Sequence, residues 1–308
     1  MPVRYLSFMK ASSSVVVVVL LLSATAAFAQ NQTAAVEPTA SQSGAAAPLH
    51  LTPDGQPDIQ GIWRANPGGD TYDLTGNVGP RPDYNLQGDG KPKPPTRRVV
   101  DPPDGKIPYQ SWAAAKEKDT QDHTDNPTKP EYVDTQAHCL LEGPVRVFIH
   151  SGFQILQTPG YVLFLTEAND ESRIVPIDSR PHVGSEIKLW QGDSRGHWEG
   201  NALVIDVTNV KAKSRFDMVG NFYSPSAHFV ERLTVVDEKT INYEVTVTDP
   251  TVYTRPWKLT ARFVRRFANN GGYELFEDAC HEGERTADTL VLSSDASKTN
   301  STGTATSK

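Results

Sequence analysis

The stretch Ser194-Arg-Gly-His-Trp-Glu-Gly-Asn-Ala-Leu-Val-Ile-Asp206 predicts a two-stranded antiparallel hairpin. Gly200 and Asn201 form its turn, because both residue types tolerate the positive φ angles of a two-residue hairpin turn. A turn of fixed length sets the register of the two strands. The predicted pairs are Glu199 with Ala202, Trp198 with Leu203, His197 with Val204, Gly196 with Ile205 and Arg195 with Asp206.

The two faces of this hairpin differ in chemistry, since neighbouring side chains of a strand point to opposite sides. We expect the apolar face to pack into a core; it carries Trp198, Leu203, Ile205 and Val207. The other face is rich in ionisable groups and carries Arg195, His197, Glu199, Val204 and Asp206.

Three residues of the polar face form the first candidate catalytic site. Arg195 lies opposite Asp206, and an arginine keeps a carboxylate ionised and able to orient the neighbouring His197. If this face lines the inside of a barrel, His197 is a candidate general acid or base. If it faces water, the same residues form a surface pair that contributes about 0.2–1 kcal/mol.

His228, at the start of a later strand, is a second candidate acid or base. A two-residue turn at Glu238-Lys239 would place it opposite Asp249, whereas a three-residue turn would move it to the other face. The alternative is a strand-edge histidine bonded to a neighbour. The sequence contains no HExxH or His-x-His motif and predicts no metal site.

The remainder of the chain after Val145 predicts an all-β fold. Segments rich in Val, Ile, Thr and aromatic residues alternate with turn residues and lack useful helical patterns between them, which favours an antiparallel meander or barrel. The predicted strands are residues 147–156, 161–167, 173–177, 187–199, 202–208, 228–237, 240–248 and 257–267.

Gly61-Ile62-Trp63 resembles the Gly-x-Trp opening of lipocalin-type barrels, in which the tryptophan plugs one end beneath a late arginine. Arg265 or Arg266, near the last predicted strand, can cover Trp63 by a cation–π contact. This resemblance implies an antiparallel, lipocalin-like (calycin-type) β-barrel in which Trp63 has a structural role.

The composition divides the chain into four parts. Residues 1–29 predict a signal peptide, 30–49 and 293–308 are polar tracts expected to be disordered, and 50–292 form a single β-barrel domain. Within that domain, residues 66–130 are rich in Pro, Gly, Asp and Lys, with a short helix around 111–118. A segment of this length and composition is typical of a functional loop or lid.

The first residues predict export to the periplasm or the extracellular space. Arg4 and Lys10 precede an apolar run at 15–22, and Ala27-Phe28-Ala29 forms a cleavage site before Gln30. The run is too short to cross a bilayer as a stable helix, so we expect no membrane anchor. Removal of the signal leaves 28 basic against 37 acidic residues, and a net charge of −9 makes nucleic-acid binding unfavourable.

Cys139 and Cys280 are the two cysteines of the chain, and an exported protein meets an oxidising compartment. We expect a disulfide between them, which loop-closure entropy would make worth about 4–5 kcal/mol. A two-Cys, two-His metal site with His138 and His281 is the alternative, but it lacks the close cysteine pair of structural zinc sites. No metal and no cofactor is therefore predicted.

Residues 192–196 match the G-x-S-x-G pattern of serine hydrolases. That motif requires a sharp turn from a strand into a helix, which exposes the serine oxygen. Here it leads into a hairpin, so we do not assign Ser194 as a nucleophile.

Aromatic residues around a predicted corner form the candidate ligand-binding set. Tyr253, Arg255 and Trp257 introduce the final strand and can rim a pocket mouth, and Trp190 joins them as a candidate. The alternative for the corner is packing between two strands.

Several motifs together resemble a family of uncharacterised secreted bacterial proteins. They are residues 57–63, 190–206, 231–233, 253–257 and Ala279-Cys-His-Glu-Gly283. The resemblance implies an export signal, a β-rich, lipocalin-like core and ligand choice within residues 66–130. It implies no particular activity.

Two functions of different classes fit these observations. The first is an exported barrel that binds a small, partly apolar molecule in an internal cavity. The second is a cofactor-independent lyase, isomerase or hydrolase that uses His197 as acid or base in the same cavity, with Arg195 stabilising a developing oxyanion. A role in an envelope assembly through sheet edges is a third possibility. The sequence predicts no oligomeric state.

Overall fold

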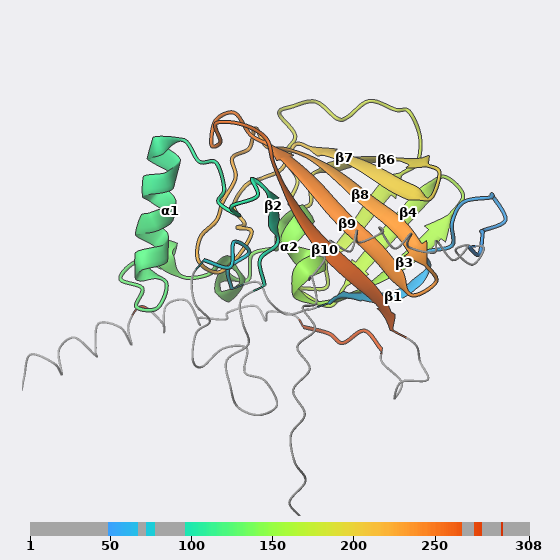
Figure 1. The fold of residues 1–308 in the computed structure, drawn as a ribbon, viewed down its shortest axis with the longest axis horizontal. Coiled ribbons are helices and arrows are strands. Elements are labelled where there is room, and N and C mark those ends of the chain that lie inside the picture. Colours follow the sequence, from blue (N-terminus) through green and yellow to red (C-terminus); the bar gives the residue numbers. More distant parts are fainter. Residues whose placement is uncertain (1–48, 67–71, 78–95, 267–273, 279–290, 292–308) are drawn as a thin grey trace, which may run out of the picture. The chain divides into compact units, whose positions relative to one another are not determined.

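The computed structural model describes residues 49–66, 72–77, 96–266, 274–278 and 291. The described part is mostly antiparallel β-structure, and the expected lipocalin-like barrel is confirmed (Figure 1). Nine strands form a nearly closed sheet in the order β5-β4-β3-β1-β10-β9-β8-β7-β6. These strands are β1 (Gly61–Ala65), β3 (Gly152–Thr158), β4 (Tyr161–Thr166), β5 (Ser172–Pro176), β6 (Asp193–Glu199), β7 (Ala202–Thr208), β8 (His228–Asp237), β9 (Thr240–Thr248) and β10 (Trp257–Arg266).

The hairpin of β6 and β7 has the predicted register in every pair, from Glu199 with Ala202 to Arg195 with Asp206. Gly200 supplies the positive φ of the turn, at 59°. The side-chain amide of Asn201 donates to the carbonyl oxygen of Val235 at 2.7 Å, which ties the turn to β8.

Two predicted strands are wrong in extent. The segment predicted as a strand from Val147 begins with a helix, α2 (Gly143–His150), and the strand starts only at Gly152. Gly143-Pro144 starts the helix, because proline suits the first turn of a helix. The strand predicted at 187–199 begins at Asp193, after a loop.

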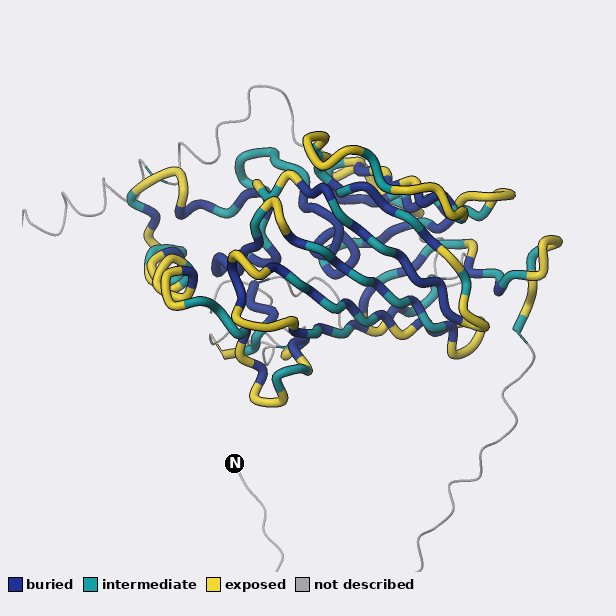
Figure 2. Tube along the Cα trace, turned by 90° about the horizontal axis from the view of Figure 1, so that it is seen from above, coloured by how far each residue is buried: buried dark blue, intermediate teal, exposed yellow. Residues whose placement is uncertain are grey.

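The interior of the barrel is filled. Residues 143–149 of α2 are buried, and the ring of Phe148 contacts aromatic residues from four strands. The strands alternate between buried and more exposed positions (Figure 2). The rings around Phe148 are Phe153, Phe164, Tyr243 and Phe263.

One end of the barrel is closed as the Gly-x-Trp resemblance implies. Trp63 is fully buried, and the Arg265 guanidinium lies 4.4 Å from its ring centroid. Arg265 also donates to the main-chain oxygens of Gln60 and Asp58. The cation therefore fastens the start of β1 to the end of β10 while it covers the tryptophan.

The seam between β5 and β6 is closed by side chains, because no backbone pairing joins these two end strands in the described sheet. Arg173 on β5 donates its Nε to Ser194 Oγ at 2.9 Å and its Nη1 to both carboxylate oxygens of Glu231 at 3.0 Å. At Gly196 a Cβ would lie 2.8 Å from Val175 Cγ1, so β5 approaches β6 where no side chain intervenes. Ser194 is thus a buried acceptor in the seam.

The segment at 66–130 contributes regular structure where it is described. The short strand β2 (Val99–Asp101) pairs with β10, and the predicted helix is confirmed as α1 (Ser111–His123). Neither α1 nor α2, the described α-helices, has the length and apolar character of a membrane-spanning helix. The predicted signal peptide at 1–29 and the tail at 293–308 lie outside the described residues, so both stay predictions.

Candidate functional site

A pocket of about 820 Å³ lies at the end of the barrel opposite Trp63. It is bordered by α1, by two short 3-10 helices, η1 (Pro130–Tyr132) and η2 (Thr135–His138), and by the loop at 212–223. This loop belongs to the barrel end, because Phe216 packs on Trp257, the first residue of β10, and Tyr223 packs on Phe229, the second residue of β8. The lining residues used below are Lys116, Tyr132, Leu140, Ser214, Arg215, Phe222 and Tyr223.

The floor of the pocket is aromatic and buried. The Tyr223 hydroxyl lies 3.2 Å from Ser214 Oγ, and burial raises the pKa of Tyr223 to about 12. Gly143, at the start of α2, has a φ of 79°, and a Cβ there would lie 2.5 Å from the Tyr223 oxygen. The floor is therefore held between the loop and the helix inside the barrel.

Two of the cations that line the pocket, Lys116 and Arg215, lie close together. Lys116 Nζ lies 4.2 Å from the Phe222 ring centroid, and the pKa of Lys116 is lowered by burial and by the neighbouring Arg215. Arg215 donates Nη2 to the main-chain oxygen of Glu131, while its Nη1 is buried without a hydrogen-bond partner. Within the described residues, neither cation lies within 4 Å of a carboxylate oxygen.

A buried ionic network lies next to this end of the barrel. Arg146 on α2 donates to both oxygens of Asp134, at 2.9 and 3.0 Å. Glu142 Oε1 lies 2.7 Å from His150 Nδ1, and the main-chain nitrogen of Glu142 donates to Glu171 at 2.5 Å. Burial raises the pKa of Glu171 to about 8. These contacts hold α2 and the segment after η1 in place, and we assign them a structural role.

The predicted ligand-binding residues do not line this pocket. Tyr253 and Trp257 are buried beneath it, and the Tyr253 hydroxyl donates to the Phe222 main-chain oxygen at 2.6 Å. Arg255 pairs with Asp101 at 3.1 Å, and Trp190 packs under Lys211. Tyr253 and Trp257 therefore pack at the corner between two strands, which was the alternative to a pocket rim. Contact of these four residues with a ligand stays a prediction.

The predicted catalytic residues lie on the outer face of the barrel, because Leu203, Ile205 and Val207 occupy the core. His197 is 59% exposed and contacts Glu199 at 3.0 Å. Arg195 pairs with Asp193 at 2.8 Å, so the predicted Arg195–Asp206 ion pair is not formed. The loop before β6 brings other partners to Asp206.

Asp206 joins two histidines. Its Oδ1 lies 2.7 Å from His182 Nε2, and its Oδ2 lies 2.6 Å from His228 Nε2. His182 Nδ1 lies 2.7 Å from Asp193 Oδ2, so both ring nitrogens of His182 face carboxylates. The hydrogen bond with Asp206 raises the pKa of His228. His182 was not among the predicted site residues, because the loop that carries it gives no signal in the sequence.

His228 pairs with Thr248 instead of the predicted Asp249, because a register shift between Val235 and Asp237 displaces the strand by one position. Bulges of this kind follow from local packing and cannot be read from turn length alone. His228 nevertheless reaches Asp206, so the structure brings together two of the four predicted catalytic residues.

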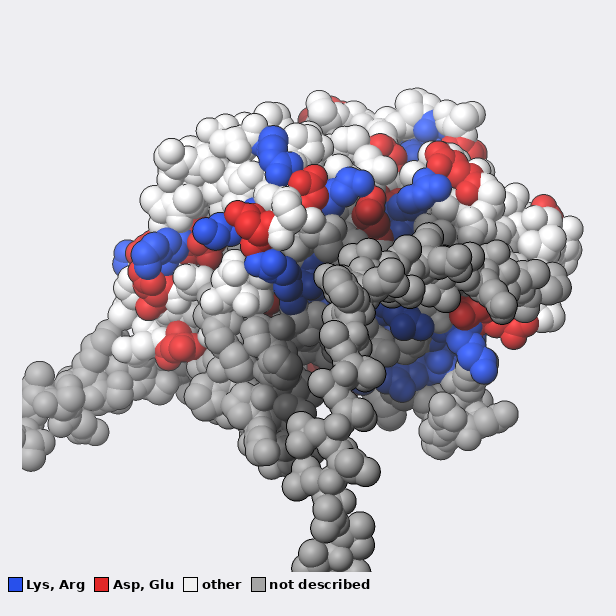
Figure 3. Space-filling view, in the orientation of Figure 1, with Lys and Arg blue, Asp and Glu red and all other residues white. Residues whose placement is uncertain are grey.

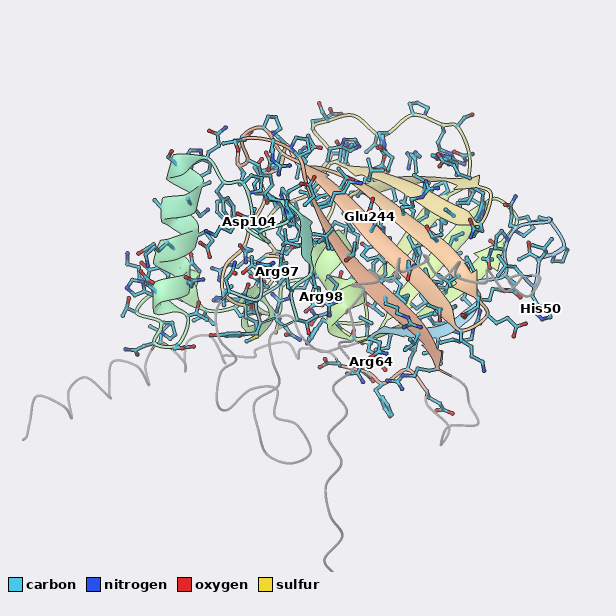
Figure 4. The ribbon with its side chains drawn as sticks, viewed as in Figure 1. His50, Arg64, Arg97, Arg98, Asp104 and Glu244 are labelled. Atoms are coloured by element: carbon cyan, nitrogen blue, oxygen red, sulfur yellow. The ribbon has the colours of Figure 1, made fainter. Side chains whose placement is uncertain are left out.

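Two further hollows lie on the outside of the barrel. One, of about 450 Å³, is bordered by Arg195, His197 and Asp206. The other, of about 730 Å³, crosses β8 to β10 near Arg97, Arg98 and Glu244 (Figure 4). Basic and acidic side chains alternate over this face (Figure 3), and many are paired, such as Glu244 with Lys258 at 2.7 Å.

No group of three or more potential metal ligands is present in the part of the chain that the structure describes. Cys280 lies outside that part, so its disulfide with Cys139 stays a prediction. In comparisons with known proteins, no family model and no curated protein matches the chain. The resemblance to secreted bacterial proteins likewise stays a prediction.

Proposed function

We propose that this protein is an exported barrel that binds a small, partly apolar molecule in the pocket at the end of the barrel. The observation that carries the proposal is the 820 Å³ pocket at the end of a barrel whose interior is filled by side chains. We place the ligand at the end of the barrel, because α2 and its aromatic neighbours occupy the space inside. Export is supported by the signal sequence predicted at residues 1–29.

The pocket has the composition of a small-molecule site. Its volume falls within the range of about 300–1,000 Å³ that is typical of ligand pockets. Apolar wall comes from Tyr132, Leu140, Phe222 and Tyr223, and a few polar groups stand among them. The helix α1 lies within residues 66–130, and η1 begins at the end of this segment. Both border the pocket, which supports a role of the segment in ligand specificity.

Binding of N-phenyl-1-naphthylamine, a neutral apolar dye whose fluorescence rises on transfer from water, tests this proposal. We expect saturable binding that Leu140→Trp abolishes, because the larger side chain fills the pocket. Tyr161→Trp is the matched control, since Tyr161 is exposed on the outer face of β4. Circular dichroism verifies the fold of both variants. Absence of dye binding, or equal binding by wild type and L140W, would overturn the proposal.

The contact between His228 and Asp206 favours acid–base catalysis as a second candidate function. A carboxylate behind a half-exposed imidazole raises its basicity, as in catalytic dyads. We expect an enzyme of this kind to lose p-nitrophenyl acetate hydrolysis in His228→Gln but not in His197→Gln. Equal rates in both variants would exclude His228 as the acting base for this ester.

A further inference from the structure

We propose that the ligand of the end pocket carries an anionic group, which Lys116 and Arg215 bind while its apolar part packs on Phe222. This inference rests on the proposed function and adds the charge of the ligand. It concerns the chemical class of an aromatic carboxylate or sulfonate.

The first argument is the missing acceptor. Burial of a hydrogen-bond donor without an acceptor is unfavourable. Arg215 Nη1 is buried and has no hydrogen-bond acceptor. Arg215 also has a planar set of donors that matches the two oxygens of a carboxylate. An anion near this side chain would supply the acceptor that the protein itself does not provide.

The second argument is the local charge. The wall of the pocket carries four cations, Lys116, Lys129, Lys213 and Arg215, against two carboxylates, Asp119 and Glu131. Asp119 accepts the hydroxyl of Tyr132 at 2.9 Å. The chain as a whole has a net charge of −7, whereas the charged residues that line this pocket have a net positive charge. A local positive potential of this kind attracts anions.

The third argument is the position of Lys116 on an aromatic ring. Its ammonium group lies over Phe222, so the cation and an apolar surface meet at one place in the pocket. A ligand with a ring next to an acidic group can contact both at once. A purely apolar ligand would instead leave Lys116 and Arg215 side by side, with no carboxylate oxygen within 4 Å of either cation in the described residues and only the more distant Asp134 and Asp217 attracting Arg215.

A pair of dyes tests the inference, because 8-anilinonaphthalene-1-sulfonate is N-phenyl-1-naphthylamine with an added sulfonate. We expect Lys116→Gln and Arg215→Gln each to weaken binding of the sulfonate dye at least tenfold, about 1.4 kcal/mol. The same variants should change the neutral dye less than twofold. Lys118→Gln is the matched control on the same helix, because Lys118 pairs with Asp122 and does not line the pocket.

A second measurement needs no variant. Raising sodium chloride from about 50 to 500 mM should weaken the sulfonate dye but not the neutral dye, because salt screens the charge interaction. In addition, 1-naphthoate should displace the sulfonate dye more effectively than 1-naphthalenemethanol.

The outcomes separate the two proposals. If neither dye binds, the proposed function fails. If both dyes bind, and K116Q, R215Q and salt leave the sulfonate dye unchanged, the pocket binds ligands but the anionic class is wrong. Equal displacement by the acid and the alcohol would also overturn the inference.

Discussion

Replacement of Arg173 by methionine should show how strongly the seam between β5 and β6 depends on one side chain. Arg173 pairs with Glu231, and the side chains of both residues are almost completely buried. Breaking a buried pair by removing one partner costs about 3–5 kcal/mol, because an uncompensated charge remains. The loss of the bond to Ser194 adds to this cost.

The size of the loss should depend on pH. Burial raises the pKa of Glu231, and the Arg173 guanidinium pulls it back down. In R173M the second effect is absent, so the folded-state pKa rises further above the unfolded value of about 4.3. A raised carboxyl pKa destabilises the fold as pH rises through it. The deficit should therefore be largest at neutral pH and shrink towards pH 5.

Urea unfolding, followed by tryptophan fluorescence at pH 7 and pH 5, measures both effects. The double variant R173M/E231L removes both charges and should recover most of the lost free energy of unfolding. A deficit below about 1 kcal/mol at pH 7, or one equal at both pH values, would refute the role of this ion pair in closing the seam.

Two further predictions concern the closed end and the outer face. Arg265→Ala should lower the free energy of unfolding by about 2 kcal/mol and increase acrylamide quenching of Trp63, because the cation–π cover and its main-chain bonds are lost; unchanged quenching would contradict this. Asp206→Asn should lower the pKa of His228, measured by NMR titration, because the hydrogen bond that raises it is weakened. In wild type the stability that this hydrogen bond contributes is fully present below about pH 6.5 and is lost as pH rises through the folded-state pKa of His228. An unchanged His228 pKa in D206N would show that Asp206 does not raise the pKa of His228.

The sequence predicted the parts of the fold that local rules control. The register of the β6–β7 hairpin follows from a two-residue turn and from alternation, and both act over a few residues. The cover of Trp63 by Arg265 was inferred from a resemblance and has the expected geometry. In both cases the chemistry of a short motif leaves few alternatives.

The errors have a common physical cause, which is that tertiary surroundings changed a local pattern. The helix α2 is buried on all sides inside the barrel, so it lacks the polar stripe that distinguishes a helix from a buried strand. Arg195 pairs with Asp193 instead of the predicted Asp206, because the loop before β6 places His182 against Asp206.

The candidate pocket could not be assembled from the sequence. Lys116 and Arg215 lie far apart in the chain and meet only because α1 and the loop at 212–223 cover the same end of the barrel. Neither residue belongs to a recognisable motif. The one useful signal was the unusual composition of residues 66–130, which indicated a functional segment without naming its residues.

The side-chain seam makes this barrel a sheet that still has two edges. In a fully hydrogen-bonded barrel no strand can accept a neighbour, whereas here β5 and β6 each lack a backbone partner on one side in the described sheet. These two edges are covered by their contact with each other and by the loop at 181–183, which bonds to Asp193 and Arg195 of β6. If a substitution of Arg173 or Gly196 separates β5 from β6, each of these strands becomes a template for a strand of another molecule. We therefore expect Ser194 and Gly196 of the G-x-S-x-G motif to limit aggregation as well as to close the seam.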